Sequence, residues 1–295
     1  DRCYLAYIDG GMHVLDISDK ANPKKISSWT NSPPYTGFMH TVVPLFDRGL
    51  MQVTDESTEN NAKDWNDQPE SRKITNDLRK LITGYSKRYV VCEATAKPVD
   101  YASPKVCGSA FAFGHQYNIV KAAKGDTEAV KAVAEYFTVT PTSMATMVSN
   151  HDIFAGKRLW DQVDGDMAQY KLAAATYLLQ PGTPFIYYGE EIGMAGIKGL
   201  EGDQPLRAPM SWTADTPGAG FTTGSKPFRP IAPNVARNNV AAQLADDQRA
   251  AARLFLLAGG DLRTDRGALR SLLYRPVEGD AGRSEEHTSE LQSHL

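Results

Sequence analysis

The sequence predicts an α/β protein that contains part of a (β/α)₈ barrel, preceded by a small antiparallel β-meander. After about residue 66, short and continuously apolar runs alternate with amphipathic helical patterns, which is typical of a parallel sheet covered by helices. Before that point, β-like runs are separated by glycine-rich turns, which is typical of antiparallel hairpins. About four of the eight βα units that close such a barrel are recognisable.

Composition limits the class of protein. The chain has 295 residues, 41% of them hydrophobic, enough for one large domain or two ordinary ones. Its net charge is -3 and its charges are interspersed, so we expect no nucleic-acid partner, because nucleic-acid binding needs clustered Lys and Arg. No apolar run reaches the roughly 18 residues of a membrane-spanning helix, so we expect no membrane partner.

The cysteines and the start of the chain lead to two further expectations. Cys3, Cys92 and Cys107 make an odd number, and their spacing is not that of metal ligands. We therefore expect no disulfide framework. The chain begins at Asp1 without Met or a signal peptide, and we expect the native start to be missing.

Residues 1–65 are expected to form the antiparallel meander. Tyr4–Ile8, Met12–Ile17 and Lys24–Trp29 are β-like runs separated by turn residues. Together with "FMHTVVPLFDRGLMQVTDEST" after them, they resemble LVIVD-repeat proteins, which are built like β-propellers. One repeat or slightly more is present, and repeats of this kind bury their faces against neighbours. An unspecific β-meander is the alternative.

The elements after residue 66 alternate in type. Helices are expected at Glu70–Gly84, Asp126–Phe137 and Asp166–Gln180. Strands are expected at Arg88–Glu93, Gly108–Phe113, Ser143–Asp152 and Thr183–Gly189. The first helix has one apolar face, formed by Ile74, Leu78, Leu81 and Ile82. The C-terminal ends of such strands form the face on which (β/α)₈ barrels carry their working residues.

Polar residues stand at those strand ends. Glu93 ends the first strand, His151 and Asp152 end the third, and Glu190 and Glu191 follow the fourth. A carboxyl at the end of an apolar strand is partly desolvated, which raises its pKa and suits it to donate a proton. Two such carboxyls facing one cavity are what glycoside hydrolysis requires. From spacing alone, acids that anchor loops explain the pattern equally well.

The segments "MVSNHD", "QPGTPFIYYGEEIGM" and "LRAPMSWT...AGFTTG" resemble the α-amylase family, glycoside hydrolase family 13. The first is similar to the family's segment at the seventh barrel strand, and the second to its segment at the eighth. "RYVVCEA", followed by "YASPKVCGSAFAF", is similar to the segment that carries the catalytic acid at the fifth strand. "DQPESRKITNDLRKLI" resembles the helix before it. The resemblance covers about residues 66–247 and implies a partial TIM barrel of about strands 5–8.

The resemblance implies a role for each matching residue. Glu93 is expected to be the general acid/base, which protonates the leaving glycosidic oxygen and then activates water. Asp152 is expected to stabilise the oxocarbenium-like transition state by binding hydroxyls of the distorted sugar. His151 and Asn150 are expected to contact the same sugar. The substrate class is then an α-glucan or α-glucoside.

The loop after the eighth strand offers further candidates. Asp203 and Arg207 stand where substrate contacts are expected. Trp212 and Phe221 either stack on sugar or pin the loop, and pinning is favoured. Structural roles are expected for the pairs Tyr187–Tyr188, in the barrel wall, and Glu190–Glu191.

Two functional segments of the family have no counterpart in the sequence. The nucleophilic Asp of the fourth strand follows an Arg by two residues, and no RxDxxxH-like run occurs here. The third-strand Asn-His segment, which in some relatives contributes to calcium binding, is absent as well. We therefore expect no metal or other cofactor. We also expect no hydrolysis, because two-step displacement needs the nucleophile.

Four segments are predicted: an LVIVD-like part at 1–65, the half barrel at 66–247, the candidate start of a C-terminal β-domain at 248–282, and a tail at 283–295. The tail resembles a translated sequencing adapter, with a disordered polar tail as the alternative, and a false join is expected near Asn66.

The favoured function is an α-amylase family glycoside hydrolase, truncated and inactive. The alternative is a non-catalytic, propeller-type binding protein with a passenger hydrolase fragment.

The strand order also predicts distances. Neighbouring strands lie about 4.8 Å apart, so the tips of the fifth and seventh strands are expected on the order of 10 Å from each other. The carboxyls of Glu93 and Asp152 should then reach one sugar ring, with His151 beside Asp152. A half barrel leaves unpaired edges, which we expect to favour aggregation.

Overall fold

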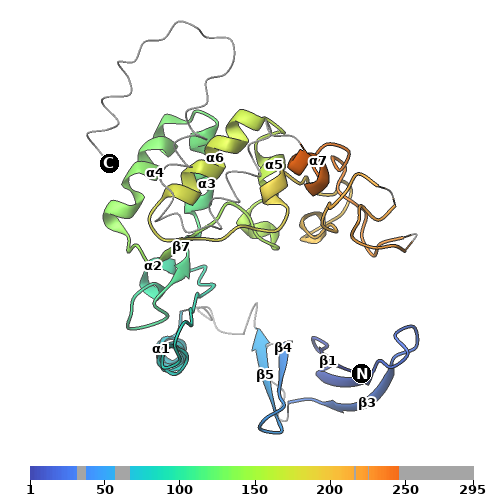
Figure 1. Cartoon of the computed structure of the whole chain (residues 1–295). Helices are drawn as coiled ribbons and strands as arrows, with labels where there is room; N and C mark the ends of the chain where they lie inside the picture. The colour runs from blue at the N-terminus through green and yellow to red at the C-terminus, as the bar shows by residue number, and fades with distance from the viewer. Residues whose placement is uncertain (32–37, 57–66, 216, 225, 246–295) are drawn as a thin grey trace, which may run out of the picture. The chain divides into compact units, whose positions relative to one another are not determined.

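The computed structural model describes residues 1–31, 38–56, 67–215, 217–224 and 226–245. The chain separates into two compact units, with the boundary between Ser71 and Arg72 (Figure 1). The predicted boundary near residue 66 stays a prediction. The boundaries predicted at 247 and 282 lie outside the described residues.

The first unit is built from antiparallel strands. β1 (Arg2–Ala6), β2 (Met12–Asp16) and β3 (Lys24–Trp29) form one sheet in that order, and β4 (Phe38–Leu45) pairs with β5 (Leu50–Glu56). β1 ends earlier than expected because the chain already turns at Tyr7, whose N–H donates to the Gly11 carbonyl at 2.8 Å. The arrangement fits the predicted meander.

The core of this unit is small. It consists of Met12, Val14 and Met39, with a few partly buried side chains packed against them. β3 is exposed along its whole length. The first unit therefore buries few of its described side chains.

The second unit contains a parallel sheet. β6 (Ala110–Phe111), β7 (Met144–Thr146) and β8 (Thr183–Pro184) pair in this order, all parallel. Cys92 makes a further parallel bridge to Ala110, so the segment predicted as the first strand lies beside β6. The order across the sheet therefore follows the order along the chain, as in a stretch of (β/α)₈ barrel.

The strands are shorter than predicted, because side chains donate hydrogen bonds to backbone carbonyls that a longer strand would pair with its neighbour. Beyond β7, the carbonyl of Val148 accepts a hydrogen bond from Gln162 Nε2 at 2.9 Å. Beyond β8, the carbonyl of Tyr188 accepts one from Arg158 Nη1 at 2.7 Å. Contacts with loop side chains thus set the path of the chain past each strand end.

The described helices are α1 (Pro69–Thr83), α2 (Pro98–Tyr101), α3 (His115–Ala123), α4 (Thr127–Val139), α5 (Leu159–Gln162), α6 (Met167–Leu179) and α7 (Val240–Ala245), with 3-10 turns η1 (Ile153–Ala155), η2 (Glu190–Ile192) and η3 (Gln204–Leu206). The expected helices are α1, α4 and α6. Asp126 and Asp166 cap α4 and α6, because each carboxylate accepts from backbone N–H groups of the first turn.

The helix α3 was not predicted from the sequence. Its apolar residues Ile119, Val120 and Ala123 are spaced for one helical face, and all are buried. Gly125, with a φ of 92°, follows the helix and is a usual stop signal. Both signals were present in the sequence.

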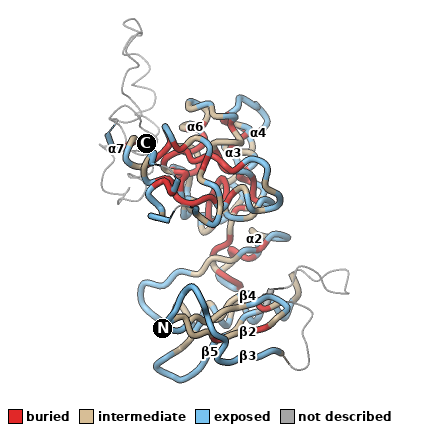
Figure 2. Tube along the Cα trace, turned by 90° about the vertical axis from the view of Figure 1, so that its right-hand side faces the viewer, coloured by how far each residue is buried: buried red, intermediate tan, exposed pale blue. Residues whose placement is uncertain are grey.

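The main core of the second unit lies where α3 packs on α6, with α4 beside α3 (Figure 1). Residues of α3 and α6 meet the side chains of Val148 and Leu159 there. Figure 2 shows buried residues concentrated in this region. A separate cluster that includes Ile192, Met194 and Met210 supports the loop after β8.

The apolar face of α1 is not covered by a core. The helix has the expected amphipathic pattern, but none of its residues is buried. Ile74, Leu78 and Leu81 are exposed. Within the described part of the chain, no other element buries this apolar face of α1.

Cys92 and Cys107 form a disulfide, which the odd number of cysteines did not lead us to expect, and Cys3 is a free thiol. Two of the three cysteines can pair whatever the total, so the odd number excluded only complete pairing. The bridge lies in a small core with Tyr101 and Met144. It anchors the residue immediately before Glu93 to the segment between α2 and β6.

Cys107→Ser is expected to lower the free energy of unfolding by about 3 kcal/mol, because a crosslink that closes a loop of this length restricts the unfolded chain by about that amount. The sequence separation of the pair is 15. Urea unfolding without reductant, followed by circular dichroism, measures the change. Cys3→Ser is the control and should change stability far less. Equal stability of Cys107→Ser and the wild type would contradict the pairing.

Candidate functional site

A polar turn lies beyond the C-terminal end of β7. The chain runs from β7 through buried residues to Asn150, where the buried run ends. The Asn150 side-chain oxygen accepts the backbone N–H of Asp152 at 2.8 Å. This local bond closes the turn and presents His151 and Asp152 at the tip of the strand.

Asp152 is held between Arg207 and His151. Arg207 Nη2 donates to Asp152 Oδ1 at 2.8 Å, and Arg207 Nε donates to the carbonyl of His151 at 2.9 Å. On the other side, His151 Nε2 lies 3.3 Å from Asp152 Oδ2. The side chain of Asp152 is 21% exposed and that of His151 is 60% exposed. The carboxylate is therefore oriented by its partners, while the imidazole faces solvent.

Asp203 completes the cluster. Its Oδ2 lies 3.1 Å from Arg207 Nη2, and its Oδ1 accepts the N–H of Ile153 at 2.8 Å. Asp203 and Arg207 flank the short turn η3, which places both beside the tip of β7. These contacts join Asn150, His151 and Asp152 with Asp203 and Arg207, which are all the candidate site residues except Glu93.

Glu93 leaves the sheet at the same edge. It directly follows Cys92, whose parallel bridge to β6 points this segment in the same direction as β7. Glu93 is exposed, so the partial desolvation expected of it is not found. The reason is that the segment pairs only through one isolated bridge at the side of β6. The distance expected between Glu93 and Asp152 stays a prediction.

A buried guanidinium joins the end of β8 to the loop that carries Arg207. Arg158 is fully buried and donates to the carbonyls of Tyr188 at 2.7 Å and Leu206 at 2.6 Å. It also lies over the rings of Tyr187 and Tyr188, 4.8 and 4.6 Å from their centres. Because Leu206 precedes Arg207, these contacts fix where Arg207 emerges. A buried arginine cannot be recognised from its neighbours in the sequence.

A buried acid stands behind the polar turn. The carboxyl of Glu190 accepts hydrogen bonds from Ser149 Oγ, from Tyr177 Oη at 3.2 Å and from the N–H of Tyr187 at 3.1 Å. Burial raises the pKa of Glu190 from 4.5 to about 7, against the opposing effect of these bonds. Since Ser149 precedes Asn150, Glu190 holds the base of the turn.

A pocket of about 570 Å³ adjoins the cluster, and Arg207 lines it. The other lining side chains include Tyr188, Glu191, Trp212, Phe221 and Phe228. Tyr188 is exposed here and does not pack in a barrel wall as predicted. Its ring instead forms one side of the pocket, because its hydroxyl donates to the carbonyl of Ala208 at 2.6 Å.

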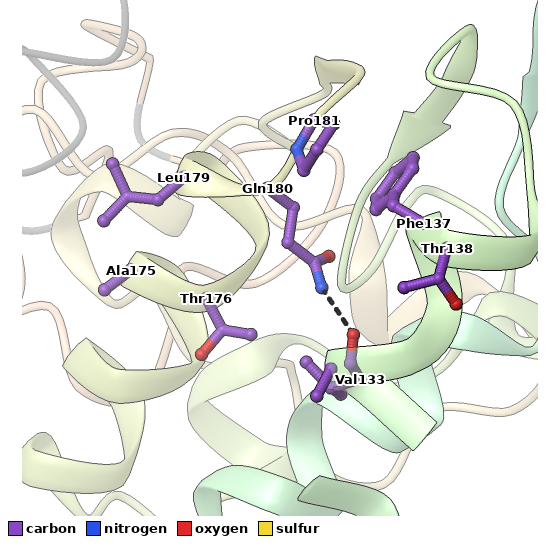
Figure 3. Close-up of a pocket in the computed structure, with 9 residues that line it drawn as sticks. Val133, Phe137, Thr138, Ala175, Thr176, Leu179, Gln180 and Pro181 are labelled. Atoms are coloured by element: carbon purple, nitrogen blue, oxygen red, sulfur yellow. Dashed lines mark hydrogen bonds between the residues drawn. The ribbon is translucent and has the colours of Figure 1, made fainter. Parts of the chain in front are cut away.

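A second pocket, of about 580 Å³, lies between α4 and α6 (Figure 3). Its lining is mainly apolar, and Gln180 Nε2 donates across it to the carbonyl of Val133 at 3.4 Å. None of its lining residues is ionisable. Both helices end near it just before β7 and β8 begin, so it lies toward the N-terminal edge of the sheet. It is therefore separate from the polar cluster.

The described ranges contain neither a metal-binding cluster nor a membrane-spanning helix. No group of His, Cys, Asp and Glu side chains in these ranges is arranged to hold a metal ion. No helix within them has the length and apolar character needed to cross a membrane. The expectation that no cofactor is bound stays a prediction.

The Alpha-amylase family (alpha amylase, catalytic domain) matches residues 19–256 of the chain. The alpha-amylase SusG of Bacteroides thetaiotaomicron is 39% identical over 104 residues, which are 35% of this chain and 13% of that protein. The trehalose synthase/amylase TreS of Mycobacterium tuberculosis is 42% identical over 69 residues, which are 23% of this chain and 11% of that protein. The chain thus spans a small part of the length of either relative.

The solved structures agree at the level of the fold. The crystal structure of alpha-amylase from H. orenii matches with a TM-score of 0.52 and 24% identity, over 63% of this chain and 39% of that chain. A match at this identity shows a shared fold and carries no residue roles.

Glu190→Gln is expected to change how stability depends on pH. The pKa of Glu190 in the folded protein, about 7, lies above the ordinary 4.5, so the native state binds this proton more tightly than the unfolded chain does. Its contribution to stability is therefore complete below pH 4.5 and is lost as the pH rises through about 7. The loss is roughly 3 kcal/mol.

Urea unfolding of wild type and variant between pH 5 and pH 8 measures this loss. The variant keeps a neutral side chain of the same shape, so it should gain stability relative to the wild type as the pH rises. Glu135→Gln, at an exposed acid of α4, is the matched control and should show no such trend. If the difference in unfolding free energy between wild type and Glu190→Gln did not change with pH, the raised pKa assigned to Glu190 would be wrong.

Proposed function

We propose that this chain, which belongs to the Alpha-amylase family, supplies the acid and the transition-state-stabilising side of a retaining glycosidase centre. The observation that carries the proposal is the polar cluster at the tip of β7, where Asp152 is held by Arg207 and His151. The proposed substrate is an α-glucan or α-glucoside. Relatives described as an alpha-amylase and as a trehalose synthase/amylase support this class.

Asp152 is suited to stabilise the positive charge that develops on the sugar ring in the transition state. A carboxylate fixed by a charge-assisted hydrogen bond needs no reorganisation when that charge appears. Arg207 provides the bond, and Asn150 fixes the backbone on which the carboxylate stands. The exposed imidazole of His151 is positioned to reach hydroxyls of the same sugar.

Glu93 is proposed as the general acid/base. It stands at the same edge of the sheet as Asp152, and the disulfide at Cys92 anchors the residue before it. In the first half of the reaction, the acid gives its proton to the glycosidic oxygen as the bond to the anomeric carbon breaks. In the second half, the carboxylate takes a proton from the attacking water.

The first half also needs a nucleophile, which bonds to the anomeric carbon as the glycosidic bond breaks and is displaced by the water in the second half. The family's segment for that residue has no counterpart in the 295 residues. We therefore propose that these residues on their own bind α-glucosides without hydrolysing them. No bond to the anomeric carbon forms, so the two-step route stops at binding.

We also propose that residues 1–65 are a fragment of an LVIVD-repeat protein, and that this fragment is joined to the rest of the chain near residue 66. The antiparallel pairing of β1 to β5 and the small core of that unit support it. The family match from residue 19 onward weighs against it, and also against the alternative of a propeller-type binding protein. Sequencing the gene across codons 60–75 tests the join, which an unbroken native reading frame would exclude. The proposed segments 248–282 and 283–295 lie outside the described residues.

The 295-residue chain is expected to show no turnover of starch, maltose-type oligosaccharides or 4-nitrophenyl α-glucoside. Loss of the nucleophile from a group of residues that works as a unit costs several orders of magnitude in rate. Release of reducing sugar and of 4-nitrophenol measures this directly. Isothermal titration with methyl α-glucoside should still show binding, which Asp152→Asn weakens.

Clear turnover that Glu93→Gln abolishes would overturn the proposed inactivity and show that another carboxylate acts as the nucleophile. Binding of methyl α-glucoside that Asp152→Asn leaves unchanged would overturn the proposed site itself.

A further inference from the structure

Five aromatic side chains form a continuous strip on one face of the parallel sheet. Their rings contact each other in the order Tyr89, Phe185, Phe111, Phe113 and Phe154, with 4.8 to 6.3 Å between the centres of neighbouring rings. None of the five is buried, and Tyr89 is 52% and Phe154 46% exposed. Single exposed rings are ordinary, whereas a contiguous apolar surface marks a place of interaction.

This aromatic strip lies on the side of the sheet that is turned away from the helices. Ala110 and Ala112 pack in the core with residues of α2 and α4, as does Met144 of β7, which pairs with Ala110. Phe111 stands between the two alanines. Because successive side chains of a strand point to opposite faces, the ring of Phe111 lies on the other face, and the rings in contact with it follow.

The sheet ends on either side in an edge that offers itself for pairing. Within the ranges that the structure describes, β8 has no strand beyond it, and the segment at Cys92 has none beyond its bridge to β6. All these segments run in the same direction. Edges of this kind are templates for further strands, and in a protein they are covered or paired.

The apolar face of α1 is exposed beside one of these edges. Arg72 of α1 donates to Asp100 Oδ2 at 2.9 Å and lies over the ring of Tyr101, 5.6 Å from its centre. Tyr101 packs with Cys107, the disulfide partner of Cys92. The helix is therefore attached next to the Cys92 edge. In the outer ring of a (β/α)₈ barrel, a helix that precedes an edge strand also covers the strand beyond that edge.

A second copy of the chain supplies what each of these surfaces lacks. The chain has four parallel segments, the one at Cys92 and β6 to β8, and a (β/α)₈ barrel closes with eight. With a twofold axis along the barrel, β8 of each copy lies beside the Cys92 segment of the other and runs in the same direction. Every edge is then paired, so the assembly stops at two copies. The first unit is no substitute, because its strands pair antiparallel.

The exposed surfaces are large enough for a stable dimer. With about 200 Å² for a fully exposed large side chain, the exposed parts of the aromatic strip and of the α1 face amount to roughly 700 Å² per copy. A standard interface buries about 800 Å² per partner, and the paired edges add backbone area to the side chains. The area that one copy offers therefore matches what a second copy needs.

We propose that two copies of this chain close one eight-stranded barrel. The aromatic strips of the two copies face each other inside it, and each α1 covers β8 of the other copy. The twofold axis keeps the direction of all strands, so both polar turns lie on the same face of the barrel. The inference goes beyond the proposed function and does not depend on it, since no sugar takes part in the closure.

Sedimentation velocity of the 295-residue chain tests the proposal, in a Cys3→Ser background so that no dimer forms through this free thiol. We expect a dimer at about 10 μM, because interfaces of standard size have dissociation constants in the micromolar range or below. Leu78→Glu places a charge in the α1 face, and Tyr89→Lys places one in the aromatic strip. Each is expected to raise the dissociation constant of the dimer about tenfold or more, because the charge would be buried without a partner.

Val130→Glu is the matched control. Val130 is 50% exposed and Leu78 is 47% exposed, but Val130 lies in α4, which packs over the middle of the sheet and away from both edges. The control should keep the dimer of the parent protein. Circular dichroism checks the folding of each variant, and if one of the two test variants fails to fold, the other decides, since they change different surfaces.

Three results would overturn the proposal. The first is a parent protein that stays monomeric at every concentration measured, which would mean that the strip is covered within one chain. The second is a dimer that Leu78→Glu and Tyr89→Lys leave as tight as before, which would place the contact elsewhere. The third is a series of species that grows beyond the dimer with concentration, which would show that the edges pair in open chains and close no barrel.

Discussion

The candidate site depends on one buried charge, the guanidinium of Arg158. A charged group without exposure is costly unless its partners replace water. Here two backbone carbonyls and the faces of Tyr187 and Tyr188 take that role. The carbonyls belong to segments far apart in sequence, the end of β8 and the end of η3. The two carbonyls that accept from this one side chain therefore fix the position of Arg207, and with it the orientation of Asp152.

A buried acid complements this arrangement from behind. Glu190 collects hydrogen bonds from Ser149, Tyr177 and Tyr187, and the positive charge of Arg158 partly offsets the rise in its pKa that burial causes. The strands of the sheet are short, so ladder hydrogen bonds alone do not fix the loops beyond them. Side-chain contacts of these two buried residues position the strand ends instead. The site is thus built from buried polar contacts more than from regular sheet.

Local signals explain what was predictable from the sequence. Asp126 and Asp166 were expected at helix starts and do cap helices, and apolar runs gave the order of the parallel strands. The lengths of those strands were not predictable, because partners such as Gln162 come from elsewhere in the chain. The same holds for Arg158, whose sequence neighbours resemble an exposed loop. The polar turn at Asp152 was visible, whereas its contact with Asp203 through Arg207 depends on tertiary structure.

A crystal structure of the chain with bound maltotetraose tests the central claim, that the polar turn beyond β7 is a sugar site. We expect one glucosyl ring with hydroxyls within hydrogen-bond distance of Asp152 and Arg207. Sugar bound instead in the apolar pocket between α4 and α6, or no sugar at the tip of β7 at a saturating concentration, would contradict it.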